Sequence, residues 1–593
     1  MLPVIRLKQP VYIFNIPYPL LMRPILVPLI VGFLWLSAIS AYADIRLSGL
    51  DSGTQENVRL MLSLSRENCQ SPEWKVRNLF SLADQEIDQG LRALGYYHGV
   101  TTKKLSHRTG CWQADFVVNA GARVQIKDMA IDYVGISQDD KDLQKLRKKL
   151  LKNVGSPLNH GIYEDMKTKI DALAREQGYL QGRFTKNQLL IDTQLNVAYI
   201  KLEYTAGKRR VFGNITLNQS ILNPDFVSHY IAIKTGDFYT SEQLAKTHND
   251  LAKSGYFERV DIHPEPENAD ASVPITINLE AKKHRHYAIG IGYDTDIGPL
   301  ISAAYENRRL NQRGHFLNTT LDVSPVLSTL DAEYSAPLSD PTNDFASMGV
   351  GLKREDTQSF KTLSAKLSGR LKHALDQGWK QTLFLDLDYE DFQIGANTTQ
   401  TLLLVPGGSW LKSVSNNAMR PSKGYRLKWD VSGSYKNPLS DVSFVQAALS
   451  ATYLYPLPWR SKFIAHSELG ATWADRFDLL PTSYRFYAGG INSIRGYAYK
   501  ELGPKDNQGL VVGGRFLTVL SMEVEKAVFN EWGLAAFLDT GNAYNPDNIL
   551  LKTGVGLGVR WYSPFGPVRV DFALPLNDAD SSFQIHFAAG ARI

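Results

Sequence analysis

Two patterns of hydrophobic and polar positions divide the chain near residue 283. Before this point, alternating segments flank stretches whose apolar residues recur at helical spacing, whereas after it two-residue alternation prevails. The pattern predicts small α+β domains followed by a long all-β region. In the last part of the first region, residues 211–217, 257–263 and 274–281 alternate, and residues 224–233 and 241–254 have helical periodicity.

The first region repeats itself with a period of about 80 residues. Each repeat has the order strand, helix, helix, strand, strand, and its helical part ends in a glycine followed by a tyrosine, at Gly95, Gly178 and Gly255. Glycine at this position suits the left-handed backbone that ends many helices. The open sheet edges of such domains can pair with an extended strand of a partner. We expect three α+β domains, at residues 44–120, 121–206 and 207–283.

Charged side chains alternate with large apolar ones in the second region. Leu383, Leu385 and Leu387 share one face of a predicted strand, and Asp386 and Asp388 share the other. A soluble β-sandwich has apolar inner faces, whereas a transmembrane barrel has lipid outside and a polar lumen inside. At about 10 residues per strand, residues 284–593 predict an antiparallel transmembrane β-barrel of about 16 strands. A soluble barrel is the alternative interpretation.

Composition and charge exclude several classes of protein. The chain has 593 residues, of which 44% are hydrophobic and 21% charged, and these fractions argue against long disorder and against a polytopic helical membrane protein. The formal net charge is only +5, and Arg6, Lys8 and Arg23 lie among the first 43 residues. A chain so close to balance has no electrostatic footprint for nucleic acid, so we expect no nucleic-acid partner.

The N-terminal segment has the features of a secretory signal peptide. Arg23 precedes the apolar run 24–36, and the small-residue sequence Ala-Tyr-Ala at 41–43 follows it. The run is shorter than the ~20 residues of a membrane-spanning helix. We therefore predict that residues 1–43 are a signal peptide cleaved before Asp44. An uncleaved membrane anchor is the alternative.

The chain has two cysteines, Cys69 and Cys111, and both fall in the first predicted domain. In an oxidising periplasm we predict that they form a disulfide. Closing a loop of about 40 residues would stabilise that domain by roughly 4 kcal/mol in the loop-entropy model. Two buried thiols are the alternative.

Common catalytic motifs are missing from the sequence. It has no His-Glu-x-x-His, no Gly-x-Ser-x-Gly and no Gly-x-x-x-x-Gly-Lys-Ser/Thr. Gly554, Gly556 and Gly558 lie on an alternating strand without a following helix, so they indicate a small-residue face of a barrel strand and not a nucleotide-binding loop. We expect no catalytic residue, no metal site and no cofactor.

Motifs near the C-terminus resemble those of the BamA/TamA superfamily of outer-membrane assembly factors. Residues 489–497 (GGINSIRGY) resemble its Arg-Gly-Phe/Tyr loop motif. Residues 533–542 (GLAAFLDTGN), 554–561 and 564–571 resemble the barrel motifs that follow in the same order. The N-terminal repeats resemble POTRA domains, and three of them before a barrel is typical of the TamA family. BamA carries five, and two-partner secretion translocases carry two.

The resemblance implies roles for individual residues. The loop that carries the motif folds back into the lumen in this family, so Arg495 is expected to pair with an acid of the barrel wall, for which Asp539 is the candidate. A guanidinium group binds a carboxylate through two parallel hydrogen bonds, which fixes the loop's orientation. Gly496 would permit a sharp turn, and Tyr497 would pack against the wall. Because the lumen is expected to be wet, the pair is expected to stabilise the barrel little. An exposed loop arginine is the alternative.

The resemblance also implies a mechanism and partners. The first barrel strand (287–293) and the last (583–593) would pair weakly, so that the barrel opens laterally and offers backbone edges to an incoming strand. Gly290, Gly292 and Gly590 would reduce side-chain packing at this seam, although glycine is common across the barrel.

The implied location is the bacterial outer membrane, with the POTRA domains in the periplasm. The implied function is the insertion and folding of other outer-membrane proteins, autotransporters in particular, with a possible role in lipid transport. The expected partners are unfolded outer-membrane clients, outer-membrane lipid and a TamB-like protein anchored in the inner membrane, which the POTRA domains contact. A two-partner secretion translocase for a soluble exoprotein is the alternative.

Overall fold

The computed structural model describes residues 44–593 apart from residues 109, 266–271, 396, 418–419, 565, 578–582 and 591–593. The predicted signal peptide, residues 1–43, and the last three residues of the predicted final strand therefore lie outside the described residues. By its internal contacts the chain separates into two compact units, one of Met1–Ala130, Leu150–Lys167 and Asn187–Lys201 and the other of Ile131–Lys149, Thr168–Lys186 and Leu202–Ile593. No helix in the described part of the chain is long and apolar enough to cross a membrane.

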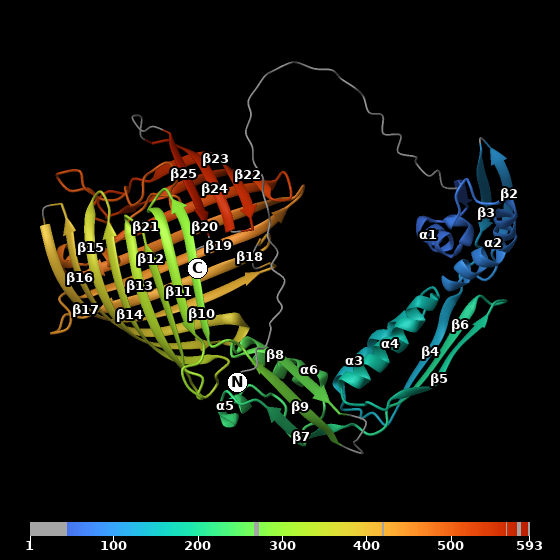
Figure 1. Ribbon diagram of the computed structural model, residues 1–593. Coiled ribbons are helices and arrows are strands. Elements are labelled where there is room, and N and C mark those ends of the chain that lie inside the picture. The colour runs from blue at the N-terminus through green and yellow to red at the C-terminus, as the bar shows by residue number, and fades with distance from the viewer. Residues whose placement is uncertain are drawn as a thin grey trace, which may run out of the picture. The chain divides into compact units, whose positions relative to one another are not determined.

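The first small domain is a three-stranded sheet with two helices on one face (Figure 1). The central strand β3 pairs in parallel with β1 and antiparallel with β2. Asp51 starts α1 by accepting hydrogen bonds from the N–H groups of Gly53 and Thr54. Its elements are β1 (Asp44–Ser48), α1 (Ser52–Met61), the 3-10 turn η1 (Ser63–Arg66), α2 (Glu73–Ala93), β2 (Val100–Arg108) and β3 (Cys111–Asn119).

The second and third small domains repeat this order of elements, so the predicted sequence of strand, helix, helix, strand, strand is confirmed in all three. In each sheet the last strand lies in the centre. The second domain has β4 (Gln125–Val134), α3 (Lys141–Leu150), the 3-10 turn η2 (Leu151–Asn153), α4 (His160–Glu176), β5 (Arg183–Asp192) and β6 (Val197–Thr205). The third has β7 (Val211–Asn218), α5 (Pro224–Ser228), α6 (Ser241–Lys253), β8 (Phe257–Pro264) and β9 (Ser272–Ala281).

The predicted helix over 224–233 was too long, because α5 ends at Ser228. The N–H of Ala232 donates to the side-chain oxygen of Thr247 on α6 at 3.0 Å, and not to a carbonyl one helical turn earlier. A side chain from a neighbouring helix thus takes over the hydrogen bond that would have continued α5. This contact comes from a residue distant in sequence, so periodicity alone does not reveal it.

Equivalent arginines, Arg123 of the second domain and Arg209 of the third, make the same contact. Arg123 donates from Nε to the carbonyl of Leu94 at 2.6 Å, and one repeat later Arg209 donates from Nε to the carbonyl of Gln177 at 2.7 Å. Each arginine thereby satisfies a carbonyl at a helix C-terminus. The expected left-handed glycines are present at Gly95, Gly178 and Gly255, with φ of 90°, 91° and 82°.

Consecutive antiparallel strands form a closed barrel of 16 strands, which confirms the predicted architecture (Figure 1). The strands are β10 (Arg285–Asp294), β11 (Gly298–Asn307), β12 (Phe316–Val323), β13 (Leu327–Pro337), β14 (Asp344–Asp356), β15 (Phe360–Ala374), β16 (Trp379–Ile394), β17 (Asn397–Ser415), β18 (Gly424–Ser434), β19 (Phe444–Leu457), β20 (Ser461–Ala474), β21 (Phe516–Ala527), β22 (Trp532–Tyr544), β23 (Lys552–Ser563), β24 (Gly566–Pro575) and β25 (Gln584–Gly590). The 3-10 turn η4 (Asp376–Gly378) joins β15 to β16.

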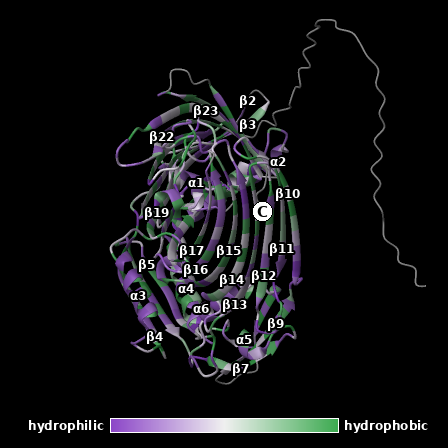
Figure 2. Ribbon diagram, turned by 90° about the vertical axis from the view of Figure 1, so that its left-hand side faces the viewer, coloured by the Kyte–Doolittle hydropathy of each residue, from purple (hydrophilic) through white to green (hydrophobic). Residues whose placement is uncertain are grey.

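The barrel wall is apolar outside and polar inside, as the alternation predicts. Ile289 and Ile291 on β10 are 82% and 77% exposed on the outer face. Asp386, Asp388 and Glu390 on β16 are buried on the inner face. Figure 2 shows hydrophobic and hydrophilic residues alternating along the barrel strands. Buried acids inside the barrel need partners. These come from Lys366 of β15, which pairs with Asp386 and Asp388, and from the loop described below.

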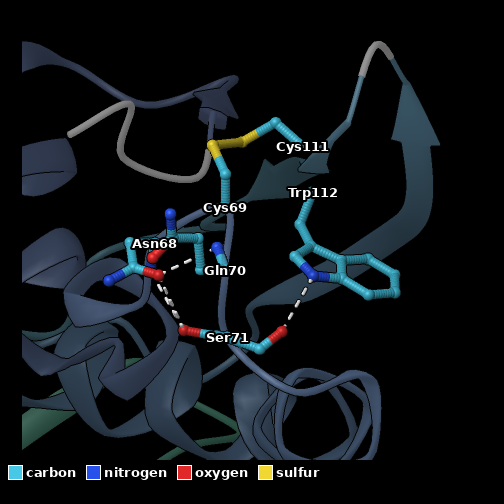
Figure 3. Close-up of a disulfide and its surroundings, with 6 residues drawn as sticks. All are labelled: Asn68, Cys69, Gln70, Ser71, Cys111 and Trp112. Atoms are coloured by element: carbon cyan, nitrogen blue, oxygen red, sulfur yellow. Dashed lines mark hydrogen bonds between the residues drawn. A yellow bond between two sulfur atoms is a disulfide. The ribbon is translucent and has the colours of Figure 1, made fainter. Parts of the chain in front are cut away.

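The structure joins Cys69 and Cys111 in a disulfide within the first small domain (Figure 3). Cys69 lies in the connection before α2, and Cys111 is the first residue of β3. In the same connection the carbonyl of Ser71 accepts a hydrogen bond from the indole N–H of Trp112 at 3.3 Å. The bond closes a segment with a sequence separation of 42. It therefore ties the start of α2 to the central strand of the sheet.

Candidate functional site

A long loop between β20 and β21, residues 475–515, carries the motif that the sequence singled out. It contains the 3-10 turns η5 (Phe477–Leu479) and η6 (Thr482–Tyr484), and isolated bridges between Phe486 and Gly514 and between Ala488 and Leu502 fold it back on itself. We call residues 489–497 the loop tip. Most of the tip is buried against the inner barrel wall, so the loop is a structured insert.

Arg495 of the loop tip binds Asp539 of β22 in a bidentate geometry. Its Nε donates to Oδ2 at 2.7 Å, and its Nη2 donates to Oδ1 at 2.9 Å. The backbone N–H of Arg495 also donates to Oδ2 of Asp539 at 3.1 Å. The structure thus brings together the two residues that the resemblance paired. Three hydrogen bonds between the same two residues fix both the side chain and the backbone of the tip.

Two further acids and a second arginine complete the cluster. Nη1 of Arg495 donates to Glu523 of β21 at 2.7 Å and to Asp571 of β24 at 3.2 Å. Arg560 of β23 binds the same two carboxylates, at 2.8 Å and 2.5 Å. We call these five residues, Arg495, Glu523, Asp539, Arg560 and Asp571, the arginine cluster. It joins the loop tip to four consecutive strands of the wall.

The burial of the cluster corrects the expectation of a wet, weak pair. The side chains of Arg495 and Asp539 are 6% and 0% exposed. The guanidinium of Arg495 also lies over the ring of Phe537, 3.4 Å from its centroid, in a cation–π contact. Removing one partner of a buried ion pair costs about 3–5 kcal/mol, because the remaining charge stays buried without compensation. The cluster therefore holds the tip far more firmly than an exposed pair would.

The glycine-rich strand β23 makes room for the tip. A Cβ atom at Gly554 would lie 1.9 Å from the carbonyl oxygen of Arg495, so no larger residue fits there. Gly496 has φ of 97°, which permits the turn that follows Arg495. Tyr497 is buried in a small apolar cluster with Leu502 of the loop and Val519 of β21. Of the three glycines predicted to form a small-residue face, Gly554 therefore lies beneath the loop, whereas Gly556 and Gly558 adjoin residues of the barrel wall.

A second group of contacts fixes the loop to the opposite part of the wall. Nζ of Lys500 donates to Glu355 of β14 at 2.5 Å, and the side chain of Glu355 is only 1% exposed. The hydroxyl of Thr482 donates to Glu390 of β16 at 2.5 Å. Tyr484 donates to Asp388. We call these contacts the loop-body anchors. Together with the arginine cluster they span the lumen from β14–β16 to β21–β24.

The seam, where β10 meets β25, has the shortest pairing in the barrel among the described residues. Its register consists of Gly292↔Gly590, Tyr293↔Ala589 and Asp294↔Ala588. On its other side β10 pairs with β11 along its whole length, from Arg285↔Asn307 to Asp294↔Gly298. Of the three predicted seam glycines, Gly292 and Gly590 face each other, whereas Gly290 is paired only with Ser302 of β11 in the described part.

The site residues that the sequence analysis missed are charged residues at inward positions of the barrel wall. Glu523, Arg560 and Asp571 each alternate with outward apolar residues, and the last two lie in segments that resemble the family's barrel motifs. Alternation indicates the side of the wall on which such a residue lies. It does not indicate the height in the barrel, which depends on the register between strands.

Comparisons with known proteins agree with this architecture. Residues 310–593 match the model of the Omp85 superfamily domain, residues 44–120 match "POTRA domain TamA domain 1", and residues 211–282 match the POTRA model described as a surface antigen variable number repeat. The outer membrane protein assembly factor BamA of Nitratidesulfovibrio vulgaris is 21% identical over 582 residues, which cover 90% of this chain and 70% of that protein. BamA of Neorickettsia risticii is 20% identical, with 73% and 62% covered.

A solved structure shares the fold. BamA from Haemophilus ducreyi, in a form lacking POTRA domains 1–3, aligns with a TM-score of 0.65 and 17% identity. The alignment covers 79% of this chain and 99% of that one. It supports a barrel preceded by small α+β domains. The chain spans 70% and 62% of the lengths of the two relatives named above, so their activities are not transferred to it directly.

Proposed function

We propose that this chain is an assembly factor of the TamA family, because residues 310–593 match the Omp85 superfamily domain, residues 44–120 and 211–282 match POTRA models, and the chain is similar to BamA. In this role it assists the insertion and folding of other proteins of the bacterial outer membrane, autotransporters in particular, and it is not an enzyme. The observation that carries the proposal is the short seam between β10 and β25 beside a loop that is firmly fixed inside the barrel.

The small domains favour TamA within the superfamily. In the described residues three of them precede the barrel, and the first matches the model of the first POTRA domain of TamA. Their proposed place is the periplasm. The sheet edges β1 and β2 of the first domain are open to strand addition, which suits a TamB-like partner anchored in the inner membrane. Lipid traffic with that partner is part of the proposal.

The seam supports lateral opening. In the described residues, positions 285–291 of β10 have no partner on the β25 side. At these positions the backbone N–H and C=O groups that point away from β11 would be available to an incoming strand once the seam separates. A client strand would add to β10 by backbone hydrogen bonds, which do not depend on its sequence. This fits a factor that serves more than one client.

A disulfide across the seam tests this mechanism. Tyr293 and Ala589 are directly opposite, at a spacing that a disulfide accommodates, so we expect Tyr293→Cys with Ala589→Cys to block client assembly under oxidation and to release it on reduction. The measurement is the yield of a folded autotransporter in membranes. Full assembly with the crosslink verified on gels would refute lateral opening.

Two controls make the result specific. The pair Met348→Cys with Gly369→Cys crosslinks β14 to β15, which are already paired along their length, and is expected to leave assembly unchanged. Reduction also opens the native bond between Cys69 and Cys111, so the unmodified protein is measured with the same reductant.

A further inference from the structure

The two edges of the seam are both attached to the loop tip. On the β10 side, the turn after β10 carries Asp296, whose two carboxylate oxygens lie 2.9 Å and 3.2 Å from the backbone nitrogen of Ile491, which donates to them. Asp296 is half-buried, and Ile491 is buried. This hydrogen bond to a carboxylate joins segments 195 residues apart in sequence.

The β25 side is attached a few residues further along the tip. The backbone N–H of Gly496 donates to Nε2 of His586 on β25 at 2.9 Å, and His586 is buried. On the neighbouring strand β24, Nη2 of Arg569 donates to Oδ1 of Asn492 at 2.5 Å. The segment from Ile491 to Gly496 therefore reaches from one side of the seam to the other.

The fit at Asp296 is close. A Cβ atom at Gly490 would lie 2.5 Å from Oδ2 of Asp296, so a side chain at this position would displace the carboxylate. Gly490 also has φ of 103°, a conformation that other residues rarely adopt. Asp296 of the β10–β11 turn thus requires a glycine at position 490 of the loop motif.

The tip cannot follow the β10–β11 turn if the seam opens. The arginine cluster binds it to β21, β22, β23 and β24, which lie on the β25 side of the seam. The loop-body anchors bind the rest of the loop to β14 and β16. Separation of β10 from β25 therefore breaks the contact of Asp296 with Ile491 and leaves the contacts of the β25 side in place.

We propose that the contact between Asp296 and the N–H of Ile491, here called the latch, holds the seam closed and sets how often it opens. The inference rests on the lateral opening proposed above and assigns Asp296 as its positioning residue. In the described residues the seam is held by three backbone pairs and by hydrogen bonds between Thr295 and Phe587 of β25. One additional charge-assisted hydrogen bond is therefore a substantial part of what opposes opening.

Hydrogen exchange of the full-length protein in lipid nanodiscs tests the latch without any client. In Asp296→Ala we expect amides of Gly292–Asp294 and 588–590 to exchange at least about tenfold faster than in the unmodified protein, since a hydrogen bond to a charged group is lost. Exchange in β14–β16 should be unchanged, which shows that the barrel has folded. Equal seam exchange in the variant and the unmodified protein would overturn the latch.

Two further variants separate the latch from a general loss of structure. Asp547→Ala removes an exposed carboxylate from the turn between β22 and β23 and should leave seam exchange unchanged. Asp296→Asn keeps the size of the side chain and one acceptor oxygen, so its seam exchange should lie within about threefold of the unmodified protein. An increase in Asp547→Ala as large as in Asp296→Ala would overturn the assignment.

Failure of the latch and failure of the proposed function give different results. If Asp296→Ala speeds seam exchange while the Tyr293–Ala589 crosslink leaves client assembly intact, the latch stands and assembly by lateral opening is wrong. If the crosslink blocks assembly while seam amides exchange equally fast in Asp296→Ala and in the unmodified protein, lateral opening stands and the latch is wrong.

Discussion

Replacing Arg495 by alanine is the most direct test of the loop as a fixed part of the barrel. The substitution removes the hydrogen bonds to Asp539, Glu523 and Asp571. Arg560 still binds Glu523 and Asp571, whereas the buried Asp539 loses its ion pair with Arg495. Loss of a partner from a buried ion pair costs about 3–5 kcal/mol. At about 1.4 kcal/mol per factor of ten, that corresponds to a roughly 10²- to 5 × 10³-fold increase in the fraction of loops released from the wall.

The barrel itself should still form in Arg495→Ala, because the strand ladders do not involve this side chain. We therefore expect heat-modifiable migration on gels to be retained, while exchange of the tip amides rises and client assembly falls severely. Arg495→Lys keeps the positive charge but loses the planar guanidinium group that binds a carboxylate through two hydrogen bonds. Exchange of its tip amides should therefore be faster than in the unmodified protein and slower than in Arg495→Ala.

Arg476→Ala is the matched control, since Arg476 lies in the same loop and makes an exposed pair with Asp478. Surface pairs contribute at most about 1 kcal/mol, so exchange and assembly should be unchanged. Tip exchange and client assembly in Arg495→Ala equal to those of the unmodified protein would refute the reasoning.

Three further predictions concern the small domains. Cys69→Ser with Cys111→Ser should lower the stability of the first domain by about 4 kcal/mol, measured in the full chain as faster exchange of β3 amides, and unchanged exchange would contradict a stabilising bond. The hydroxyl of Tyr97 lies 2.7 Å from Nε2 of His160, and burial lowers the pKa of His160. The neutral ring is therefore favoured in the folded state, so the contact between Tyr97 and His160 should be complete above about pH 6.5 and weaken as the pH falls below that value. Hydrogen exchange of the amides around His160 should show this pH dependence. The dependence should be absent in His160→Gln. A photocrosslinker at Leu60, which is 69% exposed on α1, should capture a large inner-membrane-anchored partner, whereas capture of a secreted soluble protein would favour the two-partner secretion alternative.

The sequence predicted best the features that depend on neighbouring residues, such as the face of a strand on which a side chain lies and the glycine at which a helix ends. Alternation placed Leu383 outside and Asp386 inside because successive side chains of any strand point to opposite faces. Helix ends at Gly95 and Gly178 followed from the backbone freedom of glycine. The end of α5 at Ser228 was missed because it depends on a contact with α6.

The candidate site was predicted only where a motif named both partners. Arg495 and Asp539 came from the family resemblance, and the structure places them in contact. Glu523 and Asp571 meet Arg495 because of the register of strands that lie 28 and 76 residues from it in sequence. Asp296 is still more remote, since it lies at the first turn of the barrel and meets the loop only when the sheet closes.

The distribution of contacts implies an order of events when the barrel opens. Long ladders such as that between β16 and β17 resist separation, whereas the seam has three pairs and the Thr295–Phe587 hydrogen bonds in the described residues. The arginine cluster moves with β21–β25, because four of its members belong to those strands. The latch is the contact of the tip that crosses to the β10–β11 turn, so it must break in the same step as the seam. An open state should therefore show Arg495 still bound to Asp539 and Asp296 separated from Ile491, and release of Arg495 before the seam would contradict this order.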